Sequence, residues 1–410
     1  MSLLWPTEAE PDCERRGPSM KGLVSTPEVM AALEHATGGG GISCDEARLL
    51  LDQAELSSLL RTAATVRDRS KGRTVSYSKK VFIPLTHLCR DYCGYCTFRA
   101  DPTADGELYM TSQQVLAVAE AGRRAGCKEA LFSLGDQPEV VFPEAKEFLR
   151  KQGFERTLEY LAAMTQLVLD ETGLLPHANP GVMDTKDIES LRESNVSLGL
   201  MLESTSAGIR RPKGAHWKAP DKIPSVRLKT IEEAGRLSIA FTTGILIGIG
   251  ETEEERIDSL FAIRDLHERY GHIQELIVQP FRTKAGTRMA FAPEPSTEDL
   301  LRTLAIARLI FGGSMNIQSP PNLLSDDYPI LLNGGMNDWG GISPVTKDFI
   351  NPEAEWPEIS LLAQRTATAG FQLRERLAIY PEFSARPEFV SAGVQPHLEK
   401  FRAGDGYARH

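Results

Sequence analysis

Short apolar runs and longer amphipathic stretches alternate along most of this 410-residue chain. Apolar runs of strand length occur at 81–85, 129–134, 173–177, 196–203, 239–247 and 274–281. Stretches with helical spacing separate them, near 112–125, 143–170, 184–193, 222–236 and 252–270. Strands that alternate with helices predict βα units and a parallel sheet. The pattern yields six such units, fewer than the eight of a closed barrel.

Different patterns flank this alternating region. Residues 1–26 are rich in proline and charge and predict a flexible tail, and helices are expected at 27–36, after Ser43 and at 54–69. Ser43 and Glu46 have the spacing of a capping box. A helix at 297–311 and an apolar stretch at 314–318 are candidates to close one edge of the sheet, and 319–385 predicts a loop-built cap. We therefore expect three parts: a tail with N-terminal helices at 1–70, the main α/β domain at 71–318, and a C-terminal cap and tail at 319–410.

Composition narrows the range of functions. Apolar residues make up 41% of the chain and charged residues 25%, which suits a folded protein with a large core. The net charge of −10 argues against general nucleic-acid binding. No apolar run approaches the roughly 20 residues that span a bilayer. The N-terminus lacks the pattern of a secretory signal, so we expect a cytoplasmic protein that does not enter a membrane.

Three cysteines lie within eight residues: Cys89, Cys93 and Cys96. This spacing supplies three thiolates to one iron–sulfur cluster, whereas electron-transfer clusters are held by four cysteines. One iron is then free to bind a small molecule, which is the signature of radical S-adenosylmethionine (SAM) enzymes. Tyr95 provides the aromatic residue that this family has before its last cysteine. The alternative is a zinc-stapled binding module, with His87 close to the cysteines.

Polar residues follow several predicted strands, at the ends where βα proteins carry their reactive loops. Gly135 and Asp136 correspond to a radical SAM segment that contacts the amino group of methionine, although that segment has a second glycine in place of Asp136. His177 is a candidate to transfer a proton, or else a structural hydrogen-bonding residue, and Asn179 follows it toward the expected substrate. The Glu203 carboxylate suits a ribose diol, or it caps the following loop.

Two later segments complete the candidate site. Gly244, Gly248 and Glu251 resemble the radical SAM element that lines the adenine, where glycine allows close approach of a flat ligand. The run from 333 to 346 combines an indole, a carboxylate, an amide and hydroxyls between glycines, which would suit a polar heterocycle or form a surface turn. Its candidate substrate-binding residues are Asn333, Asp338, Trp339, Ser343 and Thr346.

Together these segments resemble one family. The runs FSLGDQPE, LLPHANPG, ILIGIGET, VQPFRTKAGT and NDWGGISPVT, with the cysteine loop, are similar to the CofG-type subunit of 7,8-didemethyl-8-hydroxy-5-deazariboflavin (FO) synthase over about residues 44–360. The resemblance implies a partial (βα)6 TIM-type barrel, a 4Fe–4S cluster on the three cysteines and SAM as cofactor.

The resemblance also implies a substrate and partners. A CofG-type enzyme converts a hydroxybenzyl–ribityl-uracil adduct, made by a CofH-type partner subunit, to the deazaflavin FO with release of ammonia. A ferredoxin or flavodoxin would provide the electron. Two other radical SAM activities remain open, adduct formation of the CofH type and action on an aminofutalosine-type substrate.

Overall fold

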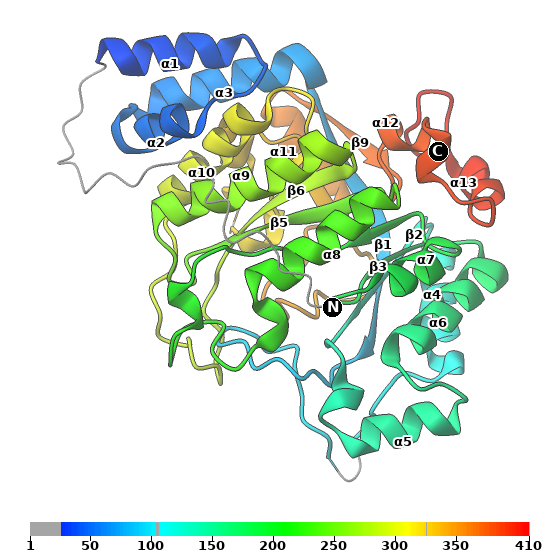
Figure 1. Ribbon diagram of the computed structural model, residues 1–410. Coiled ribbons are helices and arrows are strands. Elements are labelled where there is room, and N and C mark those ends of the chain that lie inside the picture. The colour runs from blue at the N-terminus through cyan, green and yellow to red at the C-terminus, as the bar shows by residue number, and fades with distance from the viewer. Residues whose placement is uncertain (1–25, 104–105, 325, 410) are drawn as a thin grey trace, which may run out of the picture.

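Eight parallel strands close into a barrel in the computed structural model, which describes residues 26–103, 106–324 and 326–409 (Figure 1). The strands follow one another around the barrel in chain order, and β8 and β2 both pair with β1. They are β1 (Thr74–Thr86), β2 (Glu129–Leu134), β3 (Leu175–Asn179), β4 (Ser197–Gly199), β5 (Phe241–Ile247), β6 (Ile273–Pro280), β7 (Ile317–Gln318) and β8 (Asp338–Ile342).

The expectation of a partial six-unit barrel is therefore wrong, although the TIM-type class is confirmed. Two further strands close the barrel: β7 lies within the apolar stretch 314–318, a predicted candidate to close one edge, whereas the sequence pattern does not reveal β8. β7 is two residues long, and β8 reads Asp-Trp-Gly-Gly-Ile, without an apolar run. Long β1 completes the closure, because Lys80–Thr86 pair with β2 while Ser76–Lys79 pair with β8.

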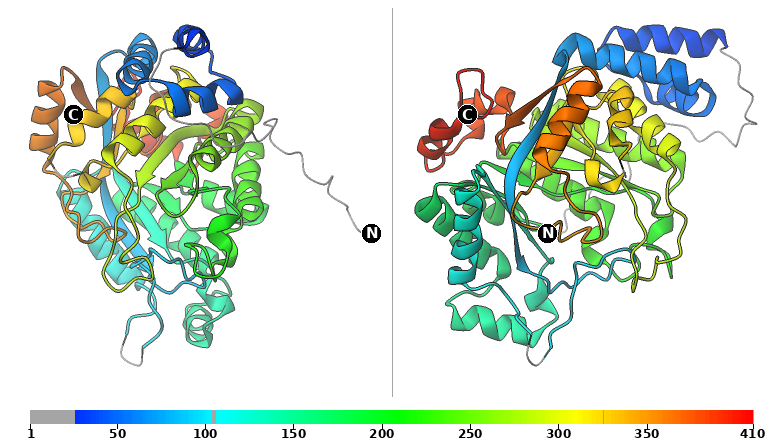
Figure 2. Two further views of the ribbon diagram at one scale, coloured as in Figure 1. Left: turned by 90° about the vertical axis from the view of Figure 1, so that its left-hand side faces the viewer. Right: turned by 180° about the vertical axis from the view of Figure 1, so that it is seen from behind.

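Helices between the strands cover the outside of the barrel (Figures 1 and 2). The predicted stretch at 143–170 is two helices instead of one, because Gly153 has a φ of +88° and interrupts it. The other helical predictions in this region agree with the structure to within a few residues. The covering helices are α4 (Ser112–Arg124), α5 (Pro143–Lys151), α6 (Thr157–Thr172), α7 (Thr185–Arg192), α8 (Pro224–Arg236), α9 (Glu253–Tyr270) and α10 (Thr297–Phe311).

The three predicted N-terminal helices are present as α1 (Pro27–Thr37), α2 (Cys44–Gln53) and α3 (Leu56–Lys71). The capping box forms as expected, since the Glu46 amide donates to Ser43 Oγ at 3.3 Å and the Ser43 amide to Glu46 Oε2 at 2.8 Å. The helices lie at one end of the barrel, and the cysteine loop lies at the other (Figures 1 and 2). The predicted tail lies outside the described residues except for Thr26, which caps α1.

The C-terminal part is more ordered than the predicted loop-built cap. After β8 come α11 (Ile359–Thr368), β9 (Gln372–Arg376), α12 (Pro381–Ser384) and α13 (Gln395–Phe401). β9 pairs with Thr74–Ser78, the first residues of β1. Residues 377–380 then close the amino-terminal end of the barrel, where the Ala378 carbonyl accepts from Ser197 Oγ at 2.6 Å and Gln274 Nε2 at 3.1 Å.

A network of buried charged side chains lies inside the barrel next to this closing segment. Buried Arg376 pairs with Asp338 at 2.7 Å and with Glu275 at 2.9 Å, and Tyr380 Oη donates to Glu275 at 2.9 Å. Ser76 donates to the same Asp338 carboxylate. We call Arg376, Asp338 and Glu275 the barrel floor, because a cavity lies between them and the carboxyl ends of the strands. No helix in the described part of the chain is long and apolar enough to span a membrane.

Candidate active site

A cavity of about 350 Å³ occupies the carboxyl-terminal half of the barrel. Loops and strand ends from around the barrel contribute to its wall, as expected for a TIM-type fold. Nine residues predicted for the site line it: Cys89, Cys93, Tyr95, Cys96, Gly135, Asp136, Asn179, Glu203 and Trp339.

The cysteine loop fits an iron–sulfur cluster. Cys89, Cys93 and Cys96 all face the cavity. The backbone amides of Asp91 and Asp136 point at Cys89 Sγ, at 3.4 and 3.2 Å, and such N–H···S bonds are typical of cluster sulfurs. Burial raises the pKa of the Cys89 thiol to about 12, so a bound metal is needed to hold this residue as a thiolate.

His87 does not complete a zinc site with the three cysteines. Its Nδ1 lies 2.8 Å from the Phe98 carbonyl oxygen, and its ring packs on Phe98 with centroids 4.4 Å apart. Of the described residues that line the cavity, none is histidine. The donor set therefore matches a cluster with one open iron better than four-coordinate zinc.

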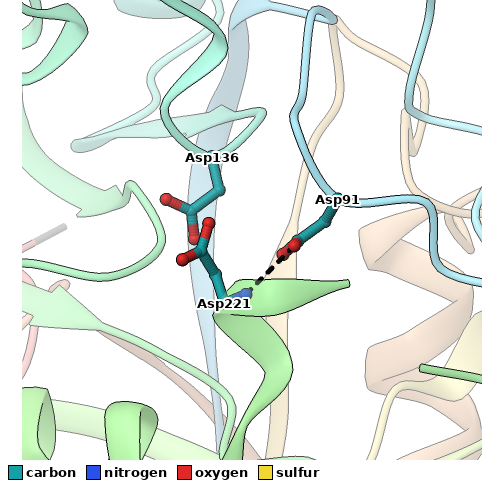
Figure 3. Close-up of side chains that lie close together, drawn as sticks. All are labelled: Asp91, Asp136 and Asp221. Carbon is teal, nitrogen blue, oxygen red and sulfur yellow. Dashed lines mark hydrogen bonds between the residues drawn. The ribbon is translucent and has the colours of Figure 1, made fainter. Parts of the chain in front are cut away.

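Three buried carboxylates meet beside the cysteine loop: Asp91, Asp136 and Asp221 (Figure 3). The Asp221 amide donates to Asp91 Oδ1 at 3.1 Å, and Arg90 pairs with Asp221. Asp136 Oδ2 accepts from the Val182 amide at 3.0 Å, whereas Oδ1 has no hydrogen-bond partner among the described residues. Burial and then the charges of Asp221 and Asp91 raise the pKa of Asp136 to about 8. We call these three carboxylates the Asp136 corner. Their charge would favour the binding of a cationic group such as a primary ammonium.

Gly135 lets the loop after β2 pass directly beneath the cysteine loop. A Cβ at this position would lie 1.9 Å from the Leu88 carbonyl oxygen and 2.6 Å from Cys89 Cβ. Such distances exclude any side chain. The departure at Asp136 from the family's second glycine thus adds a carboxylate to the cavity while Gly135 keeps the close approach.

A second cluster of polar and charged side chains surrounds Glu203, which lies on the loop after β4. Glu203 accepts hydrogen bonds from Tyr95 Oη and Lys222 Nζ, and its Oε2 lies 2.9 Å from His216 Nε2. Burial opposes its ionisation, but Lys222 and His216 hold the pKa of Glu203 well below the usual value. Its φ of +68° turns the carboxylate toward these partners. The sequence gives no signal for His216, which lies in the loop before the 3₁₀ turn Pro220–Lys222, and it predicts Lys222 only as the start of a helical stretch.

His177, the predicted catalytic residue, is not among the described residues that line the cavity. Its ring is buried lower in the barrel, with Nδ1 2.6 Å from Ser197 Oγ. Burial lowers the pKa of His177 to about 4, so the ring is neutral at pH 7. Asn179, two residues later on β3, does reach the cavity and lies over Gly199, where a Cβ would be 2.0 Å from its Oδ1.

The predicted adenine-lining residues support the backbone instead of facing the cavity. A Cβ on Gly244 would lie 2.1 Å from the Ile277 carbonyl oxygen on β6. Glu251 accepts from the Gly248 and Ile249 amides at 2.7 and 2.8 Å and pairs with Arg256, which closes the turn after β5. From this segment, Leu246 is the residue that lines the cavity.

Most of the predicted substrate-binding residues at 333–346 are not among the described residues that line the cavity. Asn333 is exposed and precedes β8, at the opposite end from the cavity, whereas Asp338 belongs to the barrel floor. Trp339 borders the cavity, but its Nε1 donates outward to Thr366 Oγ1 at 3.1 Å. Ser343 and Thr346 bond each other at 2.7 Å, and Thr346 Oγ1 accepts from the Phe82 amide. The Gly-rich run, which the sequence pattern allows to be a binding loop or a surface turn, forms strand β8 and then a tight turn at Ser343–Thr346.

Comparison with known proteins identifies the family. Residues 83–263 match the Radical SAM superfamily. A 7,8-didemethyl-8-hydroxy-5-deazariboflavin synthase from Methanopyrus kandleri is 49% identical over 335 residues, which are 82% of this chain and 100% of that protein. The FO synthases of Streptomyces avermitilis and Mycobacterium tuberculosis are 47% and 46% identical over 90% and 93% of this chain. The chain spans less than half of these two relatives, 44% and 46% of their lengths.

Solved structures with low sequence identity share the fold. Methylornithine synthase (PylB) has a TM-score of 0.66 at 20% identity, with 83% of this chain and 97% of that chain covered. The FeFe-hydrogenase maturase HydG from Carboxydothermus hydrogenoformans has a TM-score of 0.69 at 18% identity, with 92% and 85% covered. With the three-cysteine loop and the barrel cavity, these findings show that the chain is a radical SAM enzyme of the 7,8-didemethyl-8-hydroxy-5-deazariboflavin synthase family.

Proposed function

We propose that this enzyme catalyses the ring-forming reaction of FO synthesis, in which the hydroxybenzyl–ribityl-uracil adduct is converted to FO with release of ammonia. The observation that carries the proposal is the 49% identity over the whole length of the Methanopyrus kandleri synthase. The described barrel supports the proposal because a single cavity is lined by the three cysteines and by polar residues from other strands, such as Lys80 and Gln318. A cofactor and a second small molecule could therefore lie next to each other in this cavity.

The family uses a 4Fe–4S cluster and SAM, and the residues present fit both. When bound, the cluster would supply the electron for reductive cleavage of SAM. Cys89, Cys93 and Cys96 would hold the cluster, and the Asp136 corner would accept the methionine ammonium. Glu203 accepts a hydrogen bond from Tyr95, which lies between Cys93 and Cys96 and so places this carboxylate next to the cysteine loop. Glu203 would bind the ribose hydroxyls. The barrel wall and floor keep water from the reacting atoms.

Replacing Glu203 with glutamine is expected to weaken SAM binding by about 10-fold, since a hydrogen bond to a charged group is worth roughly 1.5–3 kcal/mol. Equilibrium dialysis of the reconstituted enzyme with SAM measures the change. Glu147→Gln is the matched control, because Glu147 is exposed on α5 and pairs with Lys151 alone. Equal affinity in the Glu203→Gln and control proteins would assign Glu203 a purely structural role.

The proposal extends to partners. A CofH-type subunit would supply the adduct, a ferredoxin or flavodoxin would supply the electron, and a cytoplasmic location follows from these partners. Tyr92, between Cys89 and Cys93, is 41% exposed and has Arg99 over its ring at 3.4 Å. Arg288 also reaches this loop, 2.7 Å from the Tyr92 carbonyl oxygen. Because Arg99 also pairs with exposed Asp101, the positive charge that this edge offers an acidic electron donor is that of Arg288.

Supplying the purified adduct tests the assignment. Under anaerobic, reducing conditions with SAM and without tyrosine, we expect the fluorescent product FO, identified by its mass. A CofH-type enzyme would instead need tyrosine and 5-amino-6-ribitylamino-uracil and would release the adduct. An aminofutalosine-type enzyme would use neither mixture. Absence of FO from the adduct, in a preparation that cleaves SAM, would contradict the proposal.

A further inference from the structure

Lys80 is a buried lysine that points into the cavity from the middle of β1. It is 8% exposed, and among the described residues its ammonium has no hydrogen bond or ion pair. Its Nζ lies 4.9 Å from the Trp356 ring centroid and 5.6 Å from that of Phe82. A charged amine without a hydrogen-bonding partner is costly in a protein interior, so a polar group from outside the chain is expected beside it.

Two more polar groups around the same cavity have no partner. Gln318 Oε1 on β7 and Trp356 Nε1 in the loop after β8 are buried, and neither has a hydrogen bond within the described parts of the chain. Both residues line the cavity together with Lys80. Because buried polar atoms are paired in nearly all native structures, these two unpaired atoms, next to the Lys80 ammonium over the rings of Phe82 and Trp356, indicate a ligand.

The glycine pair of β8 makes room for two of these side chains. A Cβ on Gly340 would lie 2.2 Å from Gln318 Nε2, and a Cβ on Gly341 would lie 2.4 Å from Lys80 Cδ. Gly340 also has a φ of +76°, which other residues rarely adopt. The Gly-Gly sequence therefore lets Gln318 and Lys80 extend across the barrel interior. This is the role of the Gly-rich run whose hydroxyl and amide side chains do not reach the cavity.

We propose that Lys80, Gln318 and Trp356 form the subsite for the pyrimidinedione edge of the substrate. Lys80 and Trp356 Nε1 donate hydrogen bonds, and Gln318 Oε1 accepts one. An imide edge, C(=O)–NH–C(=O), offers two acceptors and one donor, so the numbers match. The rings of Phe82 and Trp356 provide flat apolar surface for the heterocycle. The subsite rests on the proposed function for the identity of its ligand, but its two unpaired atoms and the Lys80 ammonium do not depend on it.

The charges around Lys80 fit this role. Burial lowers the pKa of Lys80, while Glu129, Asp348 and Glu275 oppose that change and Arg376 adds to it. The carboxylates therefore help to keep a donor at this position without bonding it. A cation there also stabilises negative charge on the ring oxygens.

Binding of FO, followed by its own fluorescence, tests the subsite without turnover, because FO carries the same pyrimidinedione. We expect Lys80→Met, Gln318→Met and Trp356→Phe each to raise the Kd for FO, with Lys80→Met giving about 10-fold or more. The matched control is Lys79→Met, since Lys79 is the neighbouring residue and points outward, near Gly126. Gly341→Ala keeps Lys80 but crowds it, and is also expected to weaken binding.

Iron content and unfolding temperature show whether each variant is folded and loaded. Steady-state assays with the adduct then separate the two proposals. If the wild type makes FO but Lys80→Met and Lys79→Met bind FO equally, the subsite is wrong and the proposed function stands. If the wild type binds FO in a Lys80-dependent way but does not convert the adduct, the subsite stands and the proposed function fails. A wild type that does not bind FO overturns the subsite, and so does a variant that loses kcat with unchanged KM and Kd.

Discussion

Replacing Cys93 with alanine is expected to abolish iron–sulfur cluster binding and to lower the rate of SAM cleavage by more than about 100-fold. This loss is larger than the roughly 10- to 100-fold that is typical when a residue supporting a metal ligand is replaced. Cys93 is one of three thiols that face the cavity, and no described residue offers a fourth thiol there. Two thiolates cannot hold a cluster that already has one open iron. The variant protein should be colourless after anaerobic reconstitution.

Iron and sulfide analysis, the visible absorption spectrum and 5′-deoxyadenosine release measure this result. Cys127→Ala is the matched control, because Cys127 is buried in the hydrophobic core and does not line the cavity. It should keep its iron and lose only the stability that a small core truncation costs. A Cys93→Ala protein that retains full iron and SAM cleavage would show that another residue is the third ligand. Stoichiometric zinc in the wild type would favour the zinc module instead.

Replacing Arg376 with methionine is expected to destabilise the fold by about 3–5 kcal/mol, the usual cost of removing one partner of a buried ion pair. Arg376 is 4% exposed, and both carboxylates that it pairs with, Asp338 and Glu275, are also buried. Without the guanidinium, two negative charges remain in the barrel floor. Chemical denaturation measures the change in the free energy of unfolding.

Arg374→Met is the control, since Arg374 lies on the same strand but pairs with exposed Asp405, and such surface pairs contribute about 0–1 kcal/mol. The Arg376→Met defect should become smaller as the pH falls. Burial already raises the pKa of Glu275 in the folded protein, and loss of Arg376 raises it further, so protonation removes an unfavourable charge from the folded state. A defect that is equal for both arginines, or that grows at low pH, would contradict the proposed floor.

The sequence pattern predicts the first six strands and the helices between them because their buried faces are apolar runs. It does not predict a fully closed barrel, since β7 has only two residues and β8 combines a Gly–Gly pair with the inward carboxylate of Asp338. The same limit applies to the site. The positions of Asp136, Asn179 and Glu203 after predicted strands indicate that they lie near the cysteine loop, and all three line the cavity.

Lys80, Gln318 and His216 could not be found in this way. Lys80 is a polar residue next to an apolar run, and its inward direction depends on how β1 pairs with two partners. Gln318 ends the stretch 314–318, which the pattern predicts as an edge of the sheet without a direction for its side chains. His216 reaches Glu203 from a loop whose path no periodicity describes. In each case long-range packing, instead of local pattern, decides which side chains meet.

The three-way pairing of β1 has a consequence for biosynthesis of the protein. Thr74 pairs with Gln372, which is 298 residues later in the chain, and Ser76 pairs with Asp338, which is 262 residues later. The strand that carries the cysteine loop therefore acquires these neighbours late in translation. Pairings of such long range make folding slow and leave intermediates with exposed strand edges. While the ribosome synthesises the middle of the chain, the cysteines are therefore attached to an open sheet. The strand that carries the cysteine loop gains its last neighbours only after residues 338–376 have been synthesised, and we therefore expect the cysteines to reach their final cavity after that point.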